Sequence, residues 1–263
     1  MKYRNYNNVN DMVKDTYKKA RINQTLNFNR TIRDEYENRN KILINITEAL
    51  EKLNNFIDKS DPDIELPNIQ HLFQSAEAAR MDEQPEWFQL TCFIHDLGKI
   101  MYLFGSDDTG TSIEEQWAIV GDTFIVGCKI PDTIIFPEFN NLNSDHKQYD
   151  KFGIYQKNCG LDNCIVSWGH DEFLYRTLLN NEHTLPQEAL YIIRYHSLYL
   201  WHDINEYIHL QDNNDIRMKH WVRLFNKYDL YSKSNTEIDM ESLKIYYLNL
   251  YYKFFNNNEK IYV

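Results

Sequence analysis

Scarcity of chain-breaking residues is the feature that most limits how this sequence can fold. Only 8 Gly and 6 Pro occur among 263 residues. Tight turns between strands depend on these residues, whereas long helices are interrupted by them. The sequence therefore predicts an all-α fold. Residues 117–157, which contain Gly121, Gly127, Pro131 and Pro137, are predicted to be irregular, with room for a short hairpin.

Apolar residues at helical spacing predict where the helices lie. Residues 39–57 carry such a pattern from Ile42 to Leu53. Residues 85–104 are apolar almost all round, which is typical of a helix buried in the core. Asn68 is a suitable cap for the helix that follows it. Further helices are predicted at 68–80, 168–179, 186–199, 216–231 and 241–255, with polar loops at 58–67 and 105–116.

The chain shows no division into parts. We find no internal repeat, linker or shift in composition, so residues 1–263 are predicted to form a single domain. Residues 1–38 are polar and rich in Asn, Arg and Tyr, and are interpreted as an extended or partly helical arm.

Charge and composition exclude several classes of partner. The formal net charge of −11 argues against nucleic acid or an anionic membrane, because phosphate recognition needs a basic surface. The N-terminus lacks the apolar core of a signal peptide, and no stretch approaches the ~20 apolar residues of a membrane span. Four cysteines are too few for a secreted disulfide scaffold, and Cys159 and Cys164 offer at most a zinc half-site. These features favour a soluble protein in the reducing cytoplasm.

One histidine–aspartate pair lies within the most apolar predicted helix. His95 and Asp96 stand in the string FIHDLGK. A buried imidazole and carboxylate cost much free energy unless they are paired or bound to a metal. Lys99 follows at a spacing that places all three on one side of a helix. The three polar groups therefore predict a buried site rather than ordinary packing.

Other candidate ligands lie in or beside predicted helices. His196 shares its helix face with three aliphatic residues, and Asp229 shares its face with Val222 and Phe225, so both are predicted to point inward. His71 lies on a small, polar face that could line a cavity or meet solvent. Imidazoles and carboxylates together suit iron, manganese and zinc, and an aspartate can bridge two ions.

Each of these signals has an ordinary explanation when taken alone. A single histidine on an apolar helix face is more often a hydrogen-bonded core residue than a ligand, and a single aspartate more often caps a helix or forms an ion pair. The His-Asp dipeptide also recurs, at His170-Asp171 and His202-Asp203. His170 joins the candidate set, whereas five histidines are predicted to lie in polar surroundings without a ligand role: His146, His183, His202, His209 and His220.

The order H…HD…H…H…D resembles the metal-binding set of the HD-domain superfamily. Longer strings resemble one of its families much more specifically, the myo-inositol oxygenases. They are RNY near the start, SDPDIELPNIQHLFQSAE, WFQLTCFIHDLGKIMYLFG, QWAIVGDTFIVGC, GIYQKNCGLDNCIVSWGHDEFLY, LPQEALYIIRYHSLYLWH and WVRLFNKYDLYSK, in the family's order. The resemblance implies an HD-domain-like helical bundle around a non-haem di-iron site. It also implies an oxidoreductase of inositol catabolism that cleaves the C1–C6 bond of myo-inositol with O2 to give D-glucuronate.

The resemblance further implies a role for particular residues. One iron of a mixed-valent Fe(II)/Fe(III) pair would be held by His71, His95, Asp96 and Asp229, and the other by His170 and His196, with Asp96 bridging the two. Lys99 would be catalytic, contacting the metal-bound substrate hydroxyl. The residues lining the inositol pocket or its lid would be Arg4, Asp58, Asp122, Ser197 and Lys233. The N-terminal arm would act as that lid, and the enzyme is expected to be a monomer.

One segment departs from the family pattern. Ser106–Gln116 is longer than the turn that the family usually has between its LFG and QWA strings. It leads directly into Gly121-Asp122-Thr123, so it affects where that substrate loop lies.

Two alternatives to the oxygenase remain. An HD-type metal-dependent phosphohydrolase would use the same metal scaffold, but it needs cations for its phosphate, and only Lys99, Lys233 and Arg4 are candidates. A non-catalytic interaction protein with this fold would be expected to have lost ligands, and the six ligand positions are intact.

Overall fold

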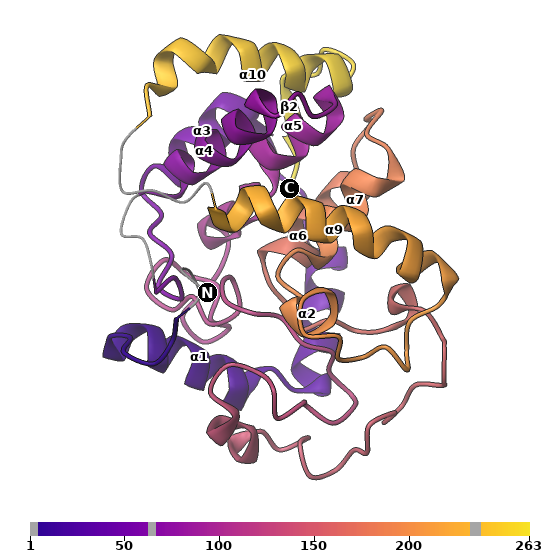
Figure 1. The fold of residues 1–263 in the computed structure, drawn as a ribbon. Helices are drawn as coiled ribbons and strands as arrows, with labels where there is room; N and C mark the ends of the chain where they lie inside the picture. The colour runs from indigo at the N-terminus through magenta and orange to yellow at the C-terminus, as the bar shows by residue number, and fades with distance from the viewer. Residues whose placement is uncertain (1–4, 63–66, 232–237) are drawn as a thin grey trace.

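The structure is a computed structural model that describes residues 5–62, 67–231 and 238–263 (Figure 1). The predicted all-α fold is confirmed. The α-helices are α1 Asp11–Asn23, α2 Leu26–Asn38, α3 Ile46–Leu53, α4 Asn68–Met81, α5 Glu86–Ile94, α6 His170–Leu179, α7 Gln187–Tyr195, α8 Tyr199–His202, α9 Asn213–Tyr231 and α10 Met240–Phe254. Short 3-10 helices η1, η2 and η3 span Leu97–Leu103, Pro137–Leu142 and Leu161–Asn163, and strands β1 and β2 span Leu43–Asn45 and Lys260–Tyr262.

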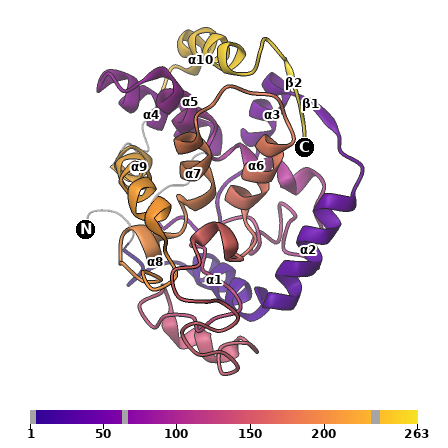
Figure 2. The ribbon, with the colours of Figure 1, turned by 90° about the vertical axis from the view of Figure 1, so that its right-hand side faces the viewer.

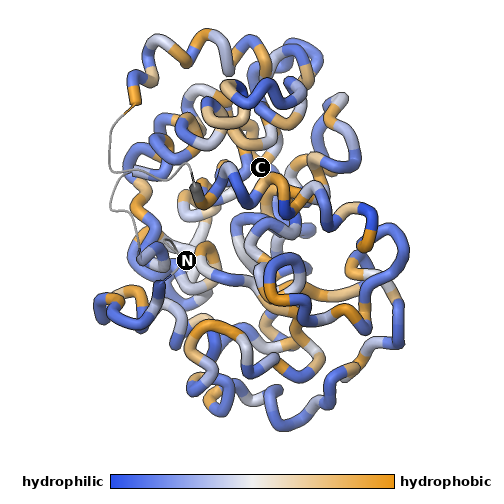
Figure 3. Tube along the Cα trace, viewed as in Figure 1, coloured by the Kyte–Doolittle hydropathy of each residue, from blue (hydrophilic) through white to orange (hydrophobic). Residues whose placement is uncertain are grey.

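Five helices form the centre of the molecule. Helix α4 packs against α5, α6 packs against α7, and α9 contacts α4, α5 and α7 (Figures 1 and 2). Helix α10 covers α4 and α5 on the outside. Hydrophobic and hydrophilic residues are interspersed along most helices in Figure 3, as expected when each helix buries one face. The central helices carry the histidines and aspartates singled out above.

The C-terminal residues pair with the segment just before α3 in a small sheet, which the sequence pattern did not predict. Strands β1 and β2 are antiparallel, with Leu43 opposite Tyr262 and Ile44 opposite Ile261. The helix predicted from residue 39 therefore begins only at Ile46, and Asn45 caps it by accepting from the backbone of Thr47. The local pattern could not reveal a strand whose partner lies more than two hundred residues away.

The predicted helices at 85–104 and 186–199 are each broken near a candidate ligand. Helix α5 ends at Ile94, His95 and Asp96 form a turn, and η1 follows. The tighter η1 lets Gly98 approach α6 so closely that a Cβ there would lie 2.0 Å from the carbonyl oxygen of His170. Helix α7 likewise ends at Tyr195, directly before His196. Continuous helices in these places were wrong predictions, and at the first of them the close packing of η1 against α6 overrides local propensity.

The N-terminal segment and residues 117–157 are the parts that were predicted to be less regular. Helices α1 and α2 lie within residues 1–38, in keeping with a partly helical arm, and 117–157 is irregular as predicted apart from η2. In place of a hairpin in that region, the described residues show one isolated bridge between Ile125 and Val166. No helix in the described part of the chain is long and apolar enough to cross a membrane.

Candidate metal centre

Six candidate ligands converge at one buried point, from elements distant in sequence. His71 comes from α4, the His95-Asp96 pair from the turn after α5, His170 from the first residue of α6, His196 from the end of α7, and Asp229 from α9. All six are buried, with at most 8% of the residue exposed. The sequence left open whether His71 meets solvent or a cavity, and the structure places it in the cavity.

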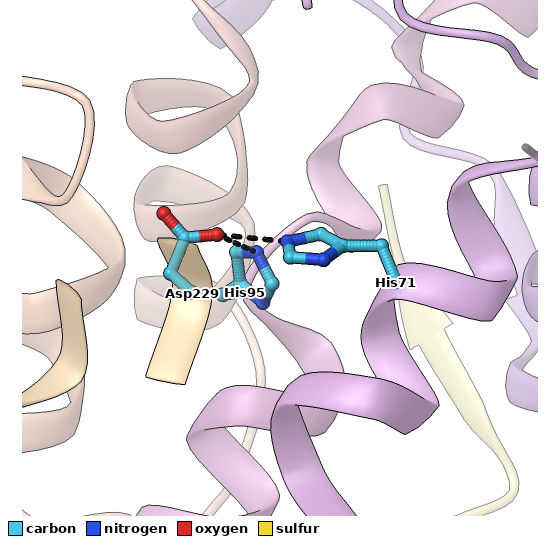
Figure 4. Close-up of side chains that lie close together, drawn as sticks. All are labelled: His71, His95 and Asp229. Atoms are coloured by element: carbon cyan, nitrogen blue, oxygen red, sulfur yellow. Dashed lines mark hydrogen bonds and ion pairs between the residues drawn. The ribbon is translucent and has the colours of Figure 1, made fainter. Parts of the chain in front are cut away.

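Figure 4 shows the first half of the site. The Nε2 atom of His71 lies 2.8 Å from Oδ1 of Asp229, and Nε2 of His95 lies 3.6 Å from the same oxygen. The hydroxyl of Tyr199 donates to the other oxygen of Asp229 at 3.2 Å. Two imidazole nitrogens and one carboxylate oxygen therefore face a common point.

Asp96 connects this half to the second one. Its Oδ2 lies 3.4 Å from Nε2 of His95, whereas its Oδ1 lies 3.0 Å from Nε2 of His170 and 3.9 Å from Nε2 of His196. The two oxygens of one carboxylate thus face different histidines.

The backbone fixes the orientation of three of the imidazole rings. The Nδ1 atoms of His95, His170 and His196 lie 2.7 to 2.8 Å from the carbonyl oxygens of Cys92, Ile119 and Ile193, respectively. Since a carbonyl only accepts, each Nδ1 carries a proton and donates it. The Nε2 atoms are left facing the site, which is the arrangement that orients histidine ligands toward a metal.

The donor set fits a bound cation. Nε2 of His170 lies 3.0 Å from Nε2 of His196. Two neutral rings with protonated Nδ1 atoms would bring two lone pairs together, so a positive charge is needed there, either a proton or a metal ion. Within the described ranges, two groups have ligand atoms within 4.8 Å of one another, His71–His95–Asp229 and His95–Asp96–His196. Nitrogen and oxygen ligands of this kind suit a divalent transition metal.

The charges around the site keep both carboxylates ionised. Burial alone would raise the pKa of Asp96, but Lys99, His95 and His170 bring it well below its ordinary value. Burial is likewise outweighed at Asp229, whose pKa is lowered by His71 and His95. Burial, helped by His170 and His95, lowers the pKa of His196 to about 3, so that ring is neutral and able to act as a ligand.

Lys99 lines the same cavity as the candidate ligands and connects Asp96 to Asp58. Its Nζ donates to Oδ2 of Asp96 at 2.9 Å and to Oδ2 of Asp58 at 2.8 Å. The two carboxylates raise the pKa of Lys99 despite its burial, so it is an ammonium. The other oxygen of Asp58 accepts from the backbone and the hydroxyl of Ser60.

A cavity of about 80 Å³ opens beside the cluster. It is lined by all six candidate ligands and Lys99, and by three of the predicted substrate residues, Asp58, Asp122 and Ser197. The other two predicted substrate residues, Arg4 and Lys233, lie outside the described residues.

Several residues of the site were missed by sequence reasoning. Asn68 was predicted to cap α4, but it is the first residue of that helix, and its side chain donates to Oδ2 of Asp96 at 2.8 Å. Tyr199, which lines the cavity, follows His196 by three residues, a spacing that could have suggested a common side. Tyr6 and Tyr17 also line it, and the Tyr17 hydroxyl donates to Asp122 at 3.2 Å. Their position depends on how α1 packs, for which the sequence has no signal.

The Ser106–Gln116 segment folds against the site's surroundings. Gln116 is buried, and its side-chain amide bonds the carbonyl of Ile57 and the amide of Lys59 on either side of Asp58. Gly110 has a φ of 67° and faces the Trp117 ring, where a Cβ would lie 2.1 Å from a ring atom. The segment therefore supports the turn that carries Asp58.

His202 and the pair Cys159 and Cys164 were also considered in the sequence. His202 is fully buried, so polar surroundings were a wrong prediction, and its Nε2 lies 2.8 Å from the carbonyl oxygen of His196. Cys159 and Cys164 come together with their Sγ atoms 3.7 Å apart. They belong to neither of the two groups of potential metal ligands found among the described residues.

A helical domain that gathers an H…HD…H…H…D set in one cavity has the arrangement of an HD-domain metal protein. The comparison with known proteins is more specific, since a model of the family "Myo-inositol oxygenase" matches residues 10–261. The chain belongs to the myo-inositol oxygenase family, and it is an oxygenase enzyme.

Three relatives named inositol oxygenases agree with this assignment. The chain is 44% identical to an inositol oxygenase of Dictyostelium discoideum over 97% of this chain and 88% of that protein. It is 44% identical to inositol oxygenase 1 of Arabidopsis thaliana over 94% of this chain and 79% of that protein. It is 40% identical to an inositol oxygenase of Mus musculus over 96% of this chain and 88% of that protein.

Proposed function

We propose that this enzyme cleaves the C1–C6 bond of myo-inositol with O2 to give D-glucuronate, using two iron ions. The convergence of four histidines and two aspartates beside a polar cavity is the observation that carries the proposal. Membership of a family whose relatives are named inositol oxygenases supports the substrate.

We assign the ligands as two sets joined by one bridge. His71, His95, Asp96 and Asp229 would hold one iron, and His170, His196 and Asp96 would hold the other. The bridging role is supported by the two oxygens of Asp96, of which one faces His95 and the other faces His170. The three backbone carbonyls behind His95, His170 and His196 keep these ligands oriented.

A mixed-valent iron pair would supply a Lewis acid for substrate hydroxyls and a centre that reacts with O2. The protein's part begins with Lys99, whose ammonium has three donors, of which Asp58 and Asp96 take two. The third would donate to the substrate oxygen that loses its proton, a charge-assisted contact.

Polar groups of the cavity would select the substrate by its hydroxyls. Asp58, Asp122 and Ser197 line the cavity and would pair with hydroxyl groups, since each buried hydroxyl needs a partner. Arg4 and Lys233 are proposed as further contacts from the family resemblance. Residues 1–38 are proposed as a lid, which is supported by the position of Tyr6 and Tyr17 at the cavity.

The test combines metal content with product analysis. We expect the purified protein to bind two irons, to give a mixed-valent spin-resonance signal that changes with myo-inositol, and to form D-glucuronate as O2 is consumed. An HD-type phosphohydrolase would instead release phosphate from phosphoesters. Protein loaded with two irons that consumes no O2 with inositol, yet hydrolyses phosphoesters, would overturn the proposal.

We also propose that the enzyme works as a monomer in the cytoplasm. The four cysteines are free thiols, which suits a reducing compartment. Light scattering of the purified protein tests the monomer, and fluorescence microscopy of the tagged chain tests the location.

A further inference from the structure

Asn68 contacts the proposed bridge, Asp96, although it carries no charge and is not one of the assigned ligands. The residue is buried, and its side-chain Nδ2 donates to Oδ2 of Asp96 at 2.8 Å. A carboxylate only accepts, so the nitrogen of the amide has to face it. This orientation is kept although it leaves the amide oxygen of Asn68 buried without a donor in the described part of the chain, which costs free energy. The bond to Asp96 therefore sets how this side chain lies.

Helix α4 does not use the Asn68 side chain for its own start. Asn68 is the first residue of the helix, Pro67 stands at the cap position, and no side chain forms a capping bond there. The backbone amide of Asn68 bonds the carbonyl of Phe56 at 2.9 Å, which anchors the residue. His71 follows three residues later, a spacing that places both on one side of the helix. The first turn of α4 thus brings a ligand and a hydrogen-bond donor to the same cluster.

The two oxygens of Asp96 have unequal surroundings. Oδ2 accepts from Asn68 at 2.8 Å and from the ammonium of Lys99 at 2.9 Å. Oδ1 faces the Nε2 atoms of His170 and His196, and it accepts from no amide or ammonium within the described ranges. A hydrogen bond stabilises the charge of the oxygen that accepts it and makes this oxygen less basic. Oδ1 is therefore the oxygen that offers more of its charge to a cation.

We propose that Asn68 is a positioning residue that directs the charge of Asp96 toward the metal position beside His170 and His196, called here the second position. This inference rests on the two-metal site of the proposed function. The first position has a carboxylate of its own, Asp229, whereas the second has two imidazoles and Oδ1 of Asp96. Without the bond from Asn68, the carboxylate can turn about its bond to Cβ. The second position therefore depends on Asn68 more than the first position does.

Lys99 does not replace Asn68 in this role, although both donate to the same oxygen. The ammonium of Lys99 also bonds Asp58 at 2.8 Å, and it ends a long side chain with several rotatable bonds. In the proposed reaction it donates to the substrate as well. Asn68 has a short side chain on an anchored backbone, so it holds Asp96 in one orientation whether or not substrate is bound.

The test measures binding of Fe(II) to the full-length, metal-free protein by anaerobic calorimetry. We expect the native protein to bind two ions. Asn68→Ala and Asn68→Leu both lack the donor but differ in volume, and both should weaken the second ion about tenfold to a hundredfold, as when an outer partner of a ligand is lost. The first ion should keep its affinity. Asn213→Ala, which changes an exposed asparagine at the first position of α9, should bind both ions as the native protein does.

Spin resonance adds a measurement that a loss of stability would not imitate. The mixed-valent signal needs two irons on one chain. At an iron concentration that fills both positions of the native protein, the signal of the Asn68 variants should therefore be lost. It should return when iron is raised about a hundredfold, because a weakened position can still be filled whereas a misfolded one cannot.

The outcomes separate this inference from the proposed function. Native protein that binds fewer than two irons would refute the two-iron site itself. If the native protein binds two, then native affinities in both Asn68 variants, equal weakening of the two ions, or weakening in Asn68→Ala alone would each refute the role given to Asn68. A measurement on the native protein covers the case in which neither variant folds. The side-chain amide protons of Asn68 should exchange slowly in the Zn(II)-loaded protein, and rapid exchange would show that the bond to Asp96 is not kept beside a metal.

Discussion

Two residues of the candidate metal centre, Asp96 and Lys99, make different contacts, so we expect them to have separable roles. Asp96 is approached by His95, His170, Asn68 and Lys99, so its charge serves both halves of the cluster. Lys99 contacts Asp96 but also reaches Asp58, on the side of the cavity. In the proposed function, Asp96 would therefore hold the metal, and Lys99 would act on the substrate bound beside it.

Replacement of Asp96 with alanine should remove the bridge. We expect Asp96→Ala to lose iron from both positions, since each ion would lose a ligand and four histidines would face one another with a single carboxylate left. Iron per chain, measured by atomic emission after gel filtration, checks this prediction. Full retention of two irons would contradict the bridging role.

Replacement of Lys99 should separate binding of the metal from turnover. Lys99→Ala should keep the two irons and lower turnover by roughly a hundredfold, a usual loss when one charged contact to a reacting oxygen is removed. Iron analysis and O2 uptake on the same preparation provide the measurement. Equal iron loss in Lys99→Ala and Asp96→Ala would show that the two roles are not distinct.

At the scale of elements, one buried carboxylate connects three helices. Glu172 of α6 pairs with Arg194 of α7 at 2.9 Å, with Arg176 at 2.8 Å, and with Arg33 of α2 at 3.5 Å. Burial would raise the pKa of Glu172, but the three arginines lower it to about 2. Glu172 follows His170 by two residues and Arg194 precedes His196 by two, so this cluster fixes α6 against α7 near both ligands.

Neutralising this carboxylate should weaken the helix pairing. Glu172→Gln should lower the free energy of unfolding by roughly 3 kcal/mol, because it leaves buried guanidinium groups without their anion. Urea denaturation at neutral pH measures the loss, and Glu182→Gln, at an exposed position after α6, serves as the matched control. Equal stability of the two variants would refute the role given to Glu172.

For the whole molecule, the small terminal sheet joins the end of the chain to the start of α3. Ile261 and Val263 are buried, whereas Tyr262 between them is 48% exposed. Val263 also exchanges two backbone hydrogen bonds with Ile42. The last residues are therefore part of the core rather than a loose tail.

Removal of residues 260–263 should destabilise the entire fold. Loss of two buried aliphatic side chains should cost about 4 kcal/mol and lower Tm by roughly 10 °C. Differential scanning calorimetry of the truncated and full chains tests this, with Tyr262→Ala as a control expected to change Tm little. A truncated chain with the Tm of the full chain would show that the sheet is dispensable.

The sequence by itself determined the helical class and identified the residues that meet in the candidate site. Few Gly and Pro favour helices, and the apolar context of His95-Asp96 makes an unpaired charge there too costly to be accidental. The inward positions predicted for His196 and Asp229 follow from the 3.6-residue period of a helix, and both are buried in the structure. The family resemblance then narrowed the reaction class, and the comparisons support it.

Only the tertiary structure decided where helices stop and which distant groups meet. The break at His95 is accompanied by a close approach of η1 to α6 at Gly98, and helix α7 ends directly before His196. The pairing of Leu43 with Tyr262 and the contact of Asn68 with Asp96 both join groups that the local pattern treats independently. A periodic pattern reports which face of an element is buried, whereas its partner is set by the packing of the whole chain.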